Sequence, residues 1–326
     1  MRRKILDVIM AVLIAALVNP AQAQQPAKIH RIGFLVVATR SFFAARIETF
    51  RQGLRGLGYV EGKNVIIEYR YAEGKLDLLP ALASELVQLK VDVIVTSSLP
   101  GVLAAKNATS TIPIVFAATG DPVGTGLVAS LARPGGNVTG LSIFGPELSG
   151  KMLELLKEAF PKVKRVVVLW NPTASGELSF KETQAVAKAL RVQLQSMEVR
   201  GSNDFESGFQ RAKKERVQAL VTIPNPVVNS NLKQVLEFAA KNRLPAMYFT
   251  SEFVDAGGLM SYGPNYTEQF RRAAVFVDKI LKGTKPADIP VEQPMRFEFV
   301  INLQAAKKIG VTIPPNVLVR ADRVIR

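Results

Sequence analysis

A glycine-spaced motif is the first candidate for chemistry in this sequence. Residues Gly124–Ala129 (GTGLVA) match the G-x-G-x-x-A spacing with which dinucleotide-binding folds approach a pyrophosphate. In those folds the turn follows a strand directly, and an acidic residue ends the next strand. Here Gly120–Val123 (GDPV) intervenes, and the next expected strand ends at Leu141 and Ser142 without an acid. The motif therefore predicts a turn with a tight helix start, and no nucleotide cofactor.

The sequence lacks the residues that nucleophilic catalysis and metal binding commonly use. The 326-residue chain has no cysteine, which excludes disulfides, iron–sulfur clusters and thiolate zinc sites. Its one histidine, His30, precedes the first expected strand, away from the carboxyl end where a catalytic triad would assemble. No Walker lysine loop and no G-x-S-x-G elbow occurs. A pair of catalytic carboxylates is not excluded, although nothing in the sequence singles one out. We expect no enzyme, no metal site and no cofactor.

Polar residues after the apolar runs of the first half offer binding chemistry instead. Ser97 and Ser98 stand just before an expected helix, where free backbone N–H groups favour a carboxylate. The alternative is that one of them only caps the helix. Asp121 is followed by Pro122, a pair that is also typical of a plain turn. The binding candidates of this half are Thr39, Ser41, Phe42, Ser97, Ser98, Thr119 and Asp121.

The second half of the chain has a matching set of polar residues. Glu252 could pair with a ligand ammonium group, or it could be a favourable acid in the first turn of a short helix. Tyr262, like Phe42, could contact an apolar ligand side chain or pack within the core. The binding candidates of this half are Asn171, Asn225, Thr250, Ser251, Glu252 and Tyr262.

Alternating strands and helices must position these residues. Short apolar runs of buried-strand type recur, separated by helical patterns such as the apolar face formed by Leu79, Leu82 and Leu86. The expected strands of the first half are 31–37, 65–71, 91–96 and 114–117, with helices at 41–57, 79–89 and 101–108. Gly58 should end the helix at 41–57 by adopting a left-handed conformation. This alternation predicts a parallel sheet covered on both faces.

A second run of the same kind follows without a long linker. Its expected strands are 165–170, 193–199, 219–223, 246–249 and 259–262, with helices at 148–159, 178–190, 204–216, 227–242 and 266–281. The fold class is therefore α/β, with two doubly wound parallel-sheet lobes joined by a hinge. Ligands of such sheets bind beyond the carboxyl ends of the strands, so two lobes that face each other make a cleft.

The lobe boundaries follow from the strand count. We expect residues 28–142 and 264–290 to form the first lobe, and residues 143–263 the second, with 291–326 crossing back. The helix at 266–281 should pack on the first lobe, because the second sheet is complete before it. The chain then crosses between the lobes near Ser142 and again near residues 262–265.

The N-terminus predicts export. A basic start at residues 2–4 precedes an uncharged apolar run at residues 9–18 and the small-x-small pattern at residues 21–23. Residues 1–23 are therefore expected to be a cleavable signal peptide, which places the mature protein in the periplasm. The net charge of +15 is spread in ones and twos without a run of five bases, so we expect no nucleic-acid partner.

Several sequence stretches resemble the periplasmic substrate-binding proteins of ABC transporters, in the family that includes tryptophan- and tyrosine-type binders. The matching stretches are residues 50–62, 67–70, 113–116, 120–123, 131–140, 147–151, 257–263 and 277–283. The resemblance implies a type I binding protein, a monomer whose lobes close on a small ligand and deliver it to a permease of the inner membrane. It also implies an amino-acid ligand, with an aromatic side chain preferred. The first loop at the expected cleft, residues 37–43, lies outside the matching stretches.

Other functions stay open at this point. A periplasmic sensor that reports to a membrane receptor would need the same cleft, and the ligand could be another hydrophobic carboxylate. An exported α/β hydrolase would need a nucleophile and a base in the cleft, which the sequence does not single out.

Overall fold

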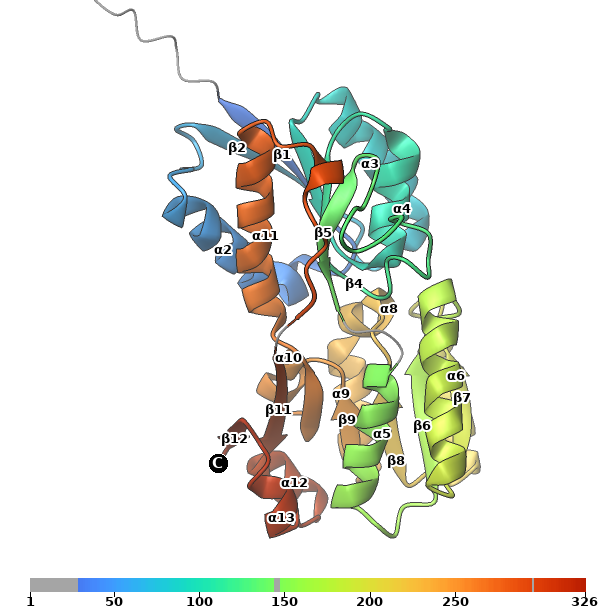
Figure 1. Cartoon of the computed structure of the whole chain (residues 1–326). Helices are drawn as coiled ribbons and strands as arrows, with labels where there is room; N and C mark the ends of the chain where they lie inside the picture. Colours follow the sequence, from blue (N-terminus) through green and yellow to red (C-terminus); the bar gives the residue numbers. More distant parts are fainter. Residues whose placement is uncertain (1–28, 144–146, 295) are drawn as a thin grey trace, which may run out of the picture.

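The computed structural model describes residues 29–143, 147–294 and 296–326, and it contains two lobes stacked end to end (Figure 1). Each lobe has a central sheet covered by helices, so the expected fold class is confirmed. The expected signal peptide, residues 1–23, lies outside the described residues. None of the described helices has the length and apolarity to cross a bilayer.

The first sheet is parallel, with the strand order β2-β1-β3-β4-β5. Its strands are β1 His30–Val36, β2 Val65–Tyr71, β3 Val93–Thr96, β4 Ile114–Thr119 and β5 Val138–Ser142. The first lobe's helices are α2 Arg40–Gly56, η1 Leu76–Leu78, α3 Leu79–Gln88, α4 Ser98–Ala108, α11 Tyr266–Leu281 and η2 Pro286–Asp288. Every residue of β3 and β4 is buried, because helices cover both faces.

Helix α11 packs against α2 and lies near β3, β4 and β5, although it follows the second lobe in sequence (Figure 1). Small residues allow this close packing: a Cβ atom at Gly53 of α2 would lie 2.8 Å from the Cβ of Ala274 and 2.8 Å from the carbonyl oxygen of Arg271. Helix α2 is followed by Gly58, whose φ of 88° is the expected left-handed conformation.

The second sheet has the order β12-β11-β10-β9-β8-β6-β7, and its neighbours are parallel except for the antiparallel pair β10–β11. Its strands are β6 Arg165–Trp170, β7 Gln193–Glu198, β8 Ala219–Thr222, β9 Ala246–Tyr248, β10 Met260–Pro264, β11 Phe297–Asn302 and β12 Arg323–Ile325. The second lobe's helices are α5 Glu147–Ala159, α6 Ala174–Ala189, α7 Asp204–Lys214, α8 Pro226–Ser230, α9 Leu232–Lys241, α10 Ser251–Asp255, α12 Leu303–Ile309 and α13 Pro315–Leu318.

Two local predictions need correction. The helix expected at 227–242 is two helices, α8 and α9, which meet at Asn231 with a φ of −112°. The helix start expected after the G-x-G-x-x-A motif does not form. Residues 122–131 make turns instead, in which the N–H groups of Leu127 and Val128 both donate to the carbonyl oxygen of Pro122.

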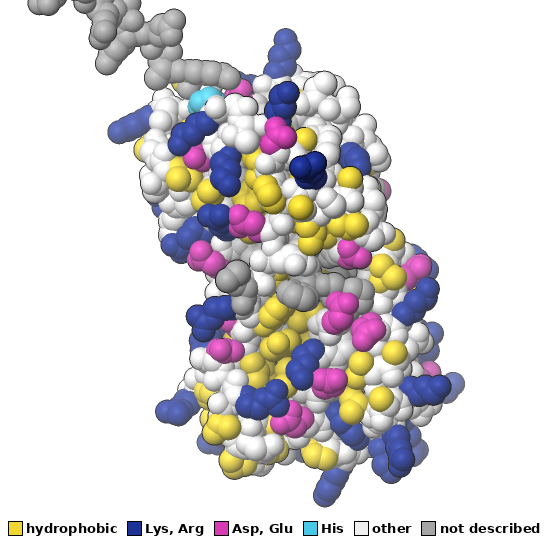
Figure 2. All heavy atoms as spheres, in the orientation of Figure 1, with side chains coloured by type: hydrophobic (Ala, Val, Ile, Leu, Met, Phe, Trp, Pro, Cys, Tyr) yellow, Lys and Arg dark blue, Asp and Glu magenta, His cyan; other side chains and the backbone are white. Residues whose placement is uncertain are grey.

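The chain passes between the lobes after β5, after β10 and before β11. These passages place the carboxyl ends of β1, β3 and β4 opposite those of β6 and β8 (Figure 1). On the face shown in Figure 2, Lys and Arg side chains are scattered over both lobes among acidic side chains.

Candidate functional site

A cleft between the two lobes is the candidate site. Its empty volume is about 1020 Å³, including the space open to solvent at its mouth. Six of the residues predicted as ligand-binding line it. The first lobe contributes Ser97, Ser98, Thr119 and Asp121, and the second lobe contributes Asn171 and Asn225.

The start of α4 forms one end of the first lobe's wall. Ser97 is the residue that precedes the helix, but its hydroxyl makes no capping hydrogen bond. Ser98 has a φ of 62°, a left-handed conformation that costs free energy in a residue with a Cβ atom. Its Oγ is buried without a hydrogen-bond partner among the described residues. A helix start, a hydroxyl without a partner among the described residues and backbone strain therefore meet at the cleft, an arrangement suited to binding an anion.

The end of β4 and the turn after it complete this wall. The Thr119 hydroxyl is buried, and it too has no partner within the described parts of the chain. Asp121 Oδ1 accepts a hydrogen bond of 2.8 Å from the N–H of Gly124, so the turn role expected for this residue is present. Asp121 also lines the cleft, and it is the acid among the described lining residues. It can therefore hold its turn and offer negative charge to a ligand.

The second lobe contributes neutral polar groups to the opposite wall. Asn171 follows β6, and its Nδ2 donates to the carbonyl oxygen of Val199 at 2.8 Å. Thr173 caps α6 by accepting from the N–H of Gly176 at 3.3 Å. Asn225 caps α8 through its Oδ1, while its Nδ2 has no partner among the described residues. Further lining residues that the sequence analysis missed are Ser149, Thr173, Ser175, Ser179 and Asn229.

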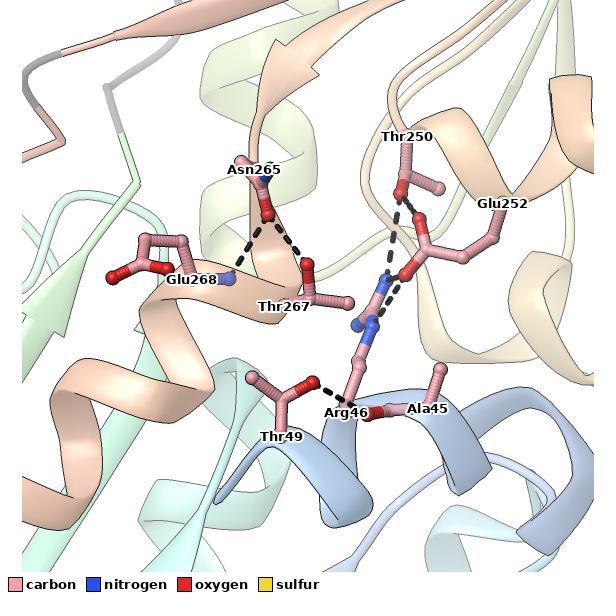
Figure 3. Close-up of polar contacts among 8 residues, drawn as sticks. All are labelled: Ala45, Arg46, Thr49, Thr250, Glu252, Asn265, Thr267 and Glu268. Atoms are coloured by element: carbon pink, nitrogen blue, oxygen red, sulfur yellow. Dashed lines mark hydrogen bonds and ion pairs between the residues drawn. The ribbon is translucent and has the colours of Figure 1, made fainter. Parts of the chain in front are cut away.

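Arg46 is a cleft residue that sequence reasoning also missed, because it lies inside α2 rather than at a strand end. Its guanidinium reaches across to the second lobe, where both Nη2 and Nε contact Glu252 Oε1, at 2.6 and 2.7 Å (Figure 3). Thr250 contacts both groups. Burial alone would raise the pKa of Glu252, but the Arg46 charge and the Thr250 hydroxyl outweigh it and hold that pKa below its usual range.

Aromatic rings surround the buried Arg46 guanidinium, whose residue is 2% exposed. The ring centroids lie 4.3 Å away for Tyr266, 4.7 Å for Phe42 and 5.2 Å for Phe43. These cation–π contacts help to hold a charge that burial disfavours. The signal in the sequence was the spacing of Phe42, Phe43 and Arg46, which places them on neighbouring parts of one helix face.

The other predicted ligand residues lie outside the cleft lining. Glu252 and Thr250 engage Arg46, and Glu252 also sits in the first turn of α10, as the alternative interpretation held. Thr39 caps α2, with Ser41 beside it. Tyr262 stacks on Phe297 of the neighbouring strand. Phe42 and Ser251 were also predicted to bind the ligand, and neither lines the cleft.

Residues 33–325 match the family described as ABC transporter substrate binding protein. The chain belongs to this family. It is 29% identical over 262 residues to a tyrosine-binding protein of Clostridioides difficile, covering 80% of this chain and 75% of that protein. The family consists of binding proteins, so the expectation that the chain is not an enzyme is confirmed, as is the resemblance noted from the sequence.

Two solved structures match most of the chain. An ABC domain of Streptococcus pneumoniae in complex with L-Trp matches with 27% identity and a TM-score of 0.83, covering 91% of this chain and 99% of that one. A ligand-free, open protein of Clostridium difficile matches with the same identity and coverage but a TM-score of 0.63. The chain therefore superposes more closely on the L-Trp complex than on the ligand-free, open structure.

Proposed function

We propose that this protein captures an amino acid with an aromatic side chain in the periplasm and delivers it to an ABC permease of the inner membrane. The first lobe's wall carries this proposal: the start of α4, the carboxylate of Asp121, and the hydroxyls of Ser98 and Thr119 meet there, and neither hydroxyl has a partner among the described residues. The tyrosine- and tryptophan-binding relatives support the aromatic side chain.

A zwitterion complements this wall. The ligand carboxylate would accept from the α4 N–H groups and from the Ser98 and Thr119 hydroxyls, because a helix start and hydroxyl donors stabilise negative charge. The ligand ammonium would donate to Asp121. Arg46 is not free to bind the carboxylate, since Glu252 neutralises it.

A thermal-shift screen of the mature protein with the twenty amino acids and small carboxylic acids tests this function. A ligand at one hundred times its Kd stabilises the folded state by about 2.7 kcal/mol, which raises the melting temperature measurably. We expect the largest shift with an aromatic amino acid. Stabilisation by carboxylic acids that lack an amine, without stabilisation by any amino acid, would refute the proposal.

A further inference from the structure

Two side-chain amides of the second lobe line the cleft at α8, one on the residue that caps the helix and one within it. Asn225 and Asn229 are four residues apart, and the N–H of Asn229 donates to the carbonyl oxygen of Asn225 at 3.0 Å. Residues at this spacing lie one above the other on a helix face. Both line the cleft, and they are 2% and 9% exposed.

The hydrogen bonds of the helix start determine how the Asn225 amide points. Its Oδ1 accepts from the N–H groups of Val227 at 2.8 Å and Val228 at 3.4 Å. The Nδ2 donor is therefore left over, and it has no partner among the described residues. Asn229 Oδ1 is a buried acceptor that also lacks one there. Buried polar groups are rarely left unpaired in folded proteins, so this donor and this acceptor need a partner from outside the described residues.

A group that both accepts and donates a hydrogen bond complements this donor and this acceptor. A hydroxyl or a carboxamide accepts one hydrogen bond and donates another, whereas a purely apolar group does neither. The described lining residues of the second lobe include no charged side chain, so this wall suits a neutral polar group rather than a carboxylate or an ammonium.

We propose that Asn225 and Asn229 select a ligand whose side chain ends in a neutral group that both accepts and donates a hydrogen bond. This inference rests on the proposed function, in which the first lobe binds the charged carboxylate and ammonium of an amino acid. An apolar side chain of the same shape leaves both amides buried and unpaired, and such sites discriminate strongly against the apolar analogue.

Two matched pairs of amino acids test the selection by calorimetric titration of the mature protein. L-tyrosine and L-phenylalanine differ only in the phenolic hydroxyl. L-glutamine and L-methionine have similar length, but only glutamine ends in a carboxamide. In whichever pair binds, the polar member should bind at least about tenfold more tightly, because the apolar member leaves buried hydrogen-bonding groups unsatisfied.

Substitutions of Asn225 and Asn229 test whether the preference for the polar ligand depends on the two amides. Asn225→Ser keeps an oxygen that can cap α8 but removes the Nδ2 donor, and Asn229→Leu replaces the acceptor with an apolar group of similar shape. Each should reduce the preference for the polar member by about tenfold. Asn231→Ser is the matched control, because the Asn231 amide donates to the carbonyl oxygen of Val227 at 2.8 Å and does not line the cleft. It should leave the preference unchanged.

The outcomes separate this inference from the proposed function. Equal binding of tyrosine and phenylalanine would refute the inference and leave the aromatic ligand standing. Binding of glutamine over methionine, without binding of either aromatic amino acid, would support the inference and refute the aromatic ligand. A preference that survives both substitutions, or failure of both pairs to bind, would overturn the role of the two amides.

Discussion

Asp121 carries two roles on one carboxylate. Its Oδ1 accepts from the N–H of Gly124, which closes the turn after β4. A Cβ atom at position 124 would lie only 2.0 Å from Asp121 Oδ2, so a larger residue there would displace the Asp121 side chain. The turn therefore packs closely against the Asp121 side chain, and the residue also lines the cleft. A substitution can separate the two roles if it keeps the acceptor and removes the charge.

Asp121→Asn should weaken amino-acid binding at least about tenfold without unfolding the protein. The amide oxygen can still accept from Gly124, whereas the ligand ammonium loses its charged partner, and a charge-assisted hydrogen bond contributes about 1.5–3 kcal/mol. Calorimetric titration and a melting curve check the two parts. Asp204→Asn is the matched control: Asp204 Oδ2 accepts from the N–H of Arg200 at 2.6 Å, outside the cleft. Unchanged affinity in Asp121→Asn would exclude ammonium pairing at this residue.

At the scale of elements, the loop between β2 and η1 forms a contact between the lobes. Gly74 in this loop has a φ of 79°, and a Cβ atom there would lie 2.6 Å from Ser230 Oγ at the end of α8. Leu76, two residues on, packs against the cores of both lobes. The loop therefore approaches α8 closely only because residue 74 has no side chain.

Gly74→Ala should weaken ligand binding by hindering this approach. Gly58→Ala is the matched control, because Gly58 has a similar φ of 88° but a Cβ atom there would meet no atom of the described residues within 4 Å. Both substitutions introduce left-handed strain, which costs about 1–2 kcal/mol, so both should lower the melting temperature. Only Gly74→Ala should also lower the ligand affinity measured by titration. An equal affinity in the two variants would show that the loop does not control closure.

At the scale of the whole molecule, the Arg46–Glu252 pair joins residues 206 positions apart and belonging to different lobes (Figure 3). The Phe42 ring also reaches the second lobe, with its centroid 6.4 Å from that of Phe253. Removing one partner of a buried ion pair is costly, because the remaining charge stays buried without compensation. We therefore expect the arrangement of the lobes to depend on both charges.

Glu252→Gln should favour a more open arrangement of the lobes. The amide keeps the shape of the side chain but leaves the buried Arg46 charge uncompensated, so we expect a larger radius of gyration in X-ray scattering and ligand binding weakened at least about tenfold. Glu48→Gln is the control, because Glu48 pairs with Arg55 at 2.6 Å on the exposed face of the same helix, α2. If the two variants have the same radius of gyration and the same ligand affinity, the Arg46–Glu252 pair does not hold the lobes together.

The same pair predicts a pH dependence of stability. The pKa of Glu252 in the folded protein lies below its usual value, so folding favours the charged form. Its contribution is fully present above the unfolded pKa of about 4.3 and is lost as the pH falls through the folded pKa. Melting temperatures between neutral pH and about pH 3 should therefore fall less steeply in Glu252→Gln than in the unaltered protein. Parallel curves would contradict this role for Glu252.

Much of the architecture was predictable from the sequence, because it depends on local patterns. Residues 32–36 of β1 and 93–95 of β3 carry no polar side chain and are buried, as strands covered on both faces must be. Strand-end residues such as Ser98, Thr119 and Asn225 were predicted as cleft residues, because the carboxyl ends of parallel strands share one edge of a sheet. The break at Asn231 was missed, because the apolar helical spacing continues through it.

Only the tertiary structure decided which side chains of the two lobes pair with each other. Arg46 lies inside a helix and Glu252 begins a short one, so neither sequence neighbourhood indicates the other. Glu252 pairs with Arg46, and Asp121 is left to face the cleft, because of the way that the lobes meet. The sequence alone determines hydrophobic periodicity and strand ends, which act over a few residues. Pairing across a hinge depends on the packing of α2 and α10 from separate lobes, which no local pattern encodes.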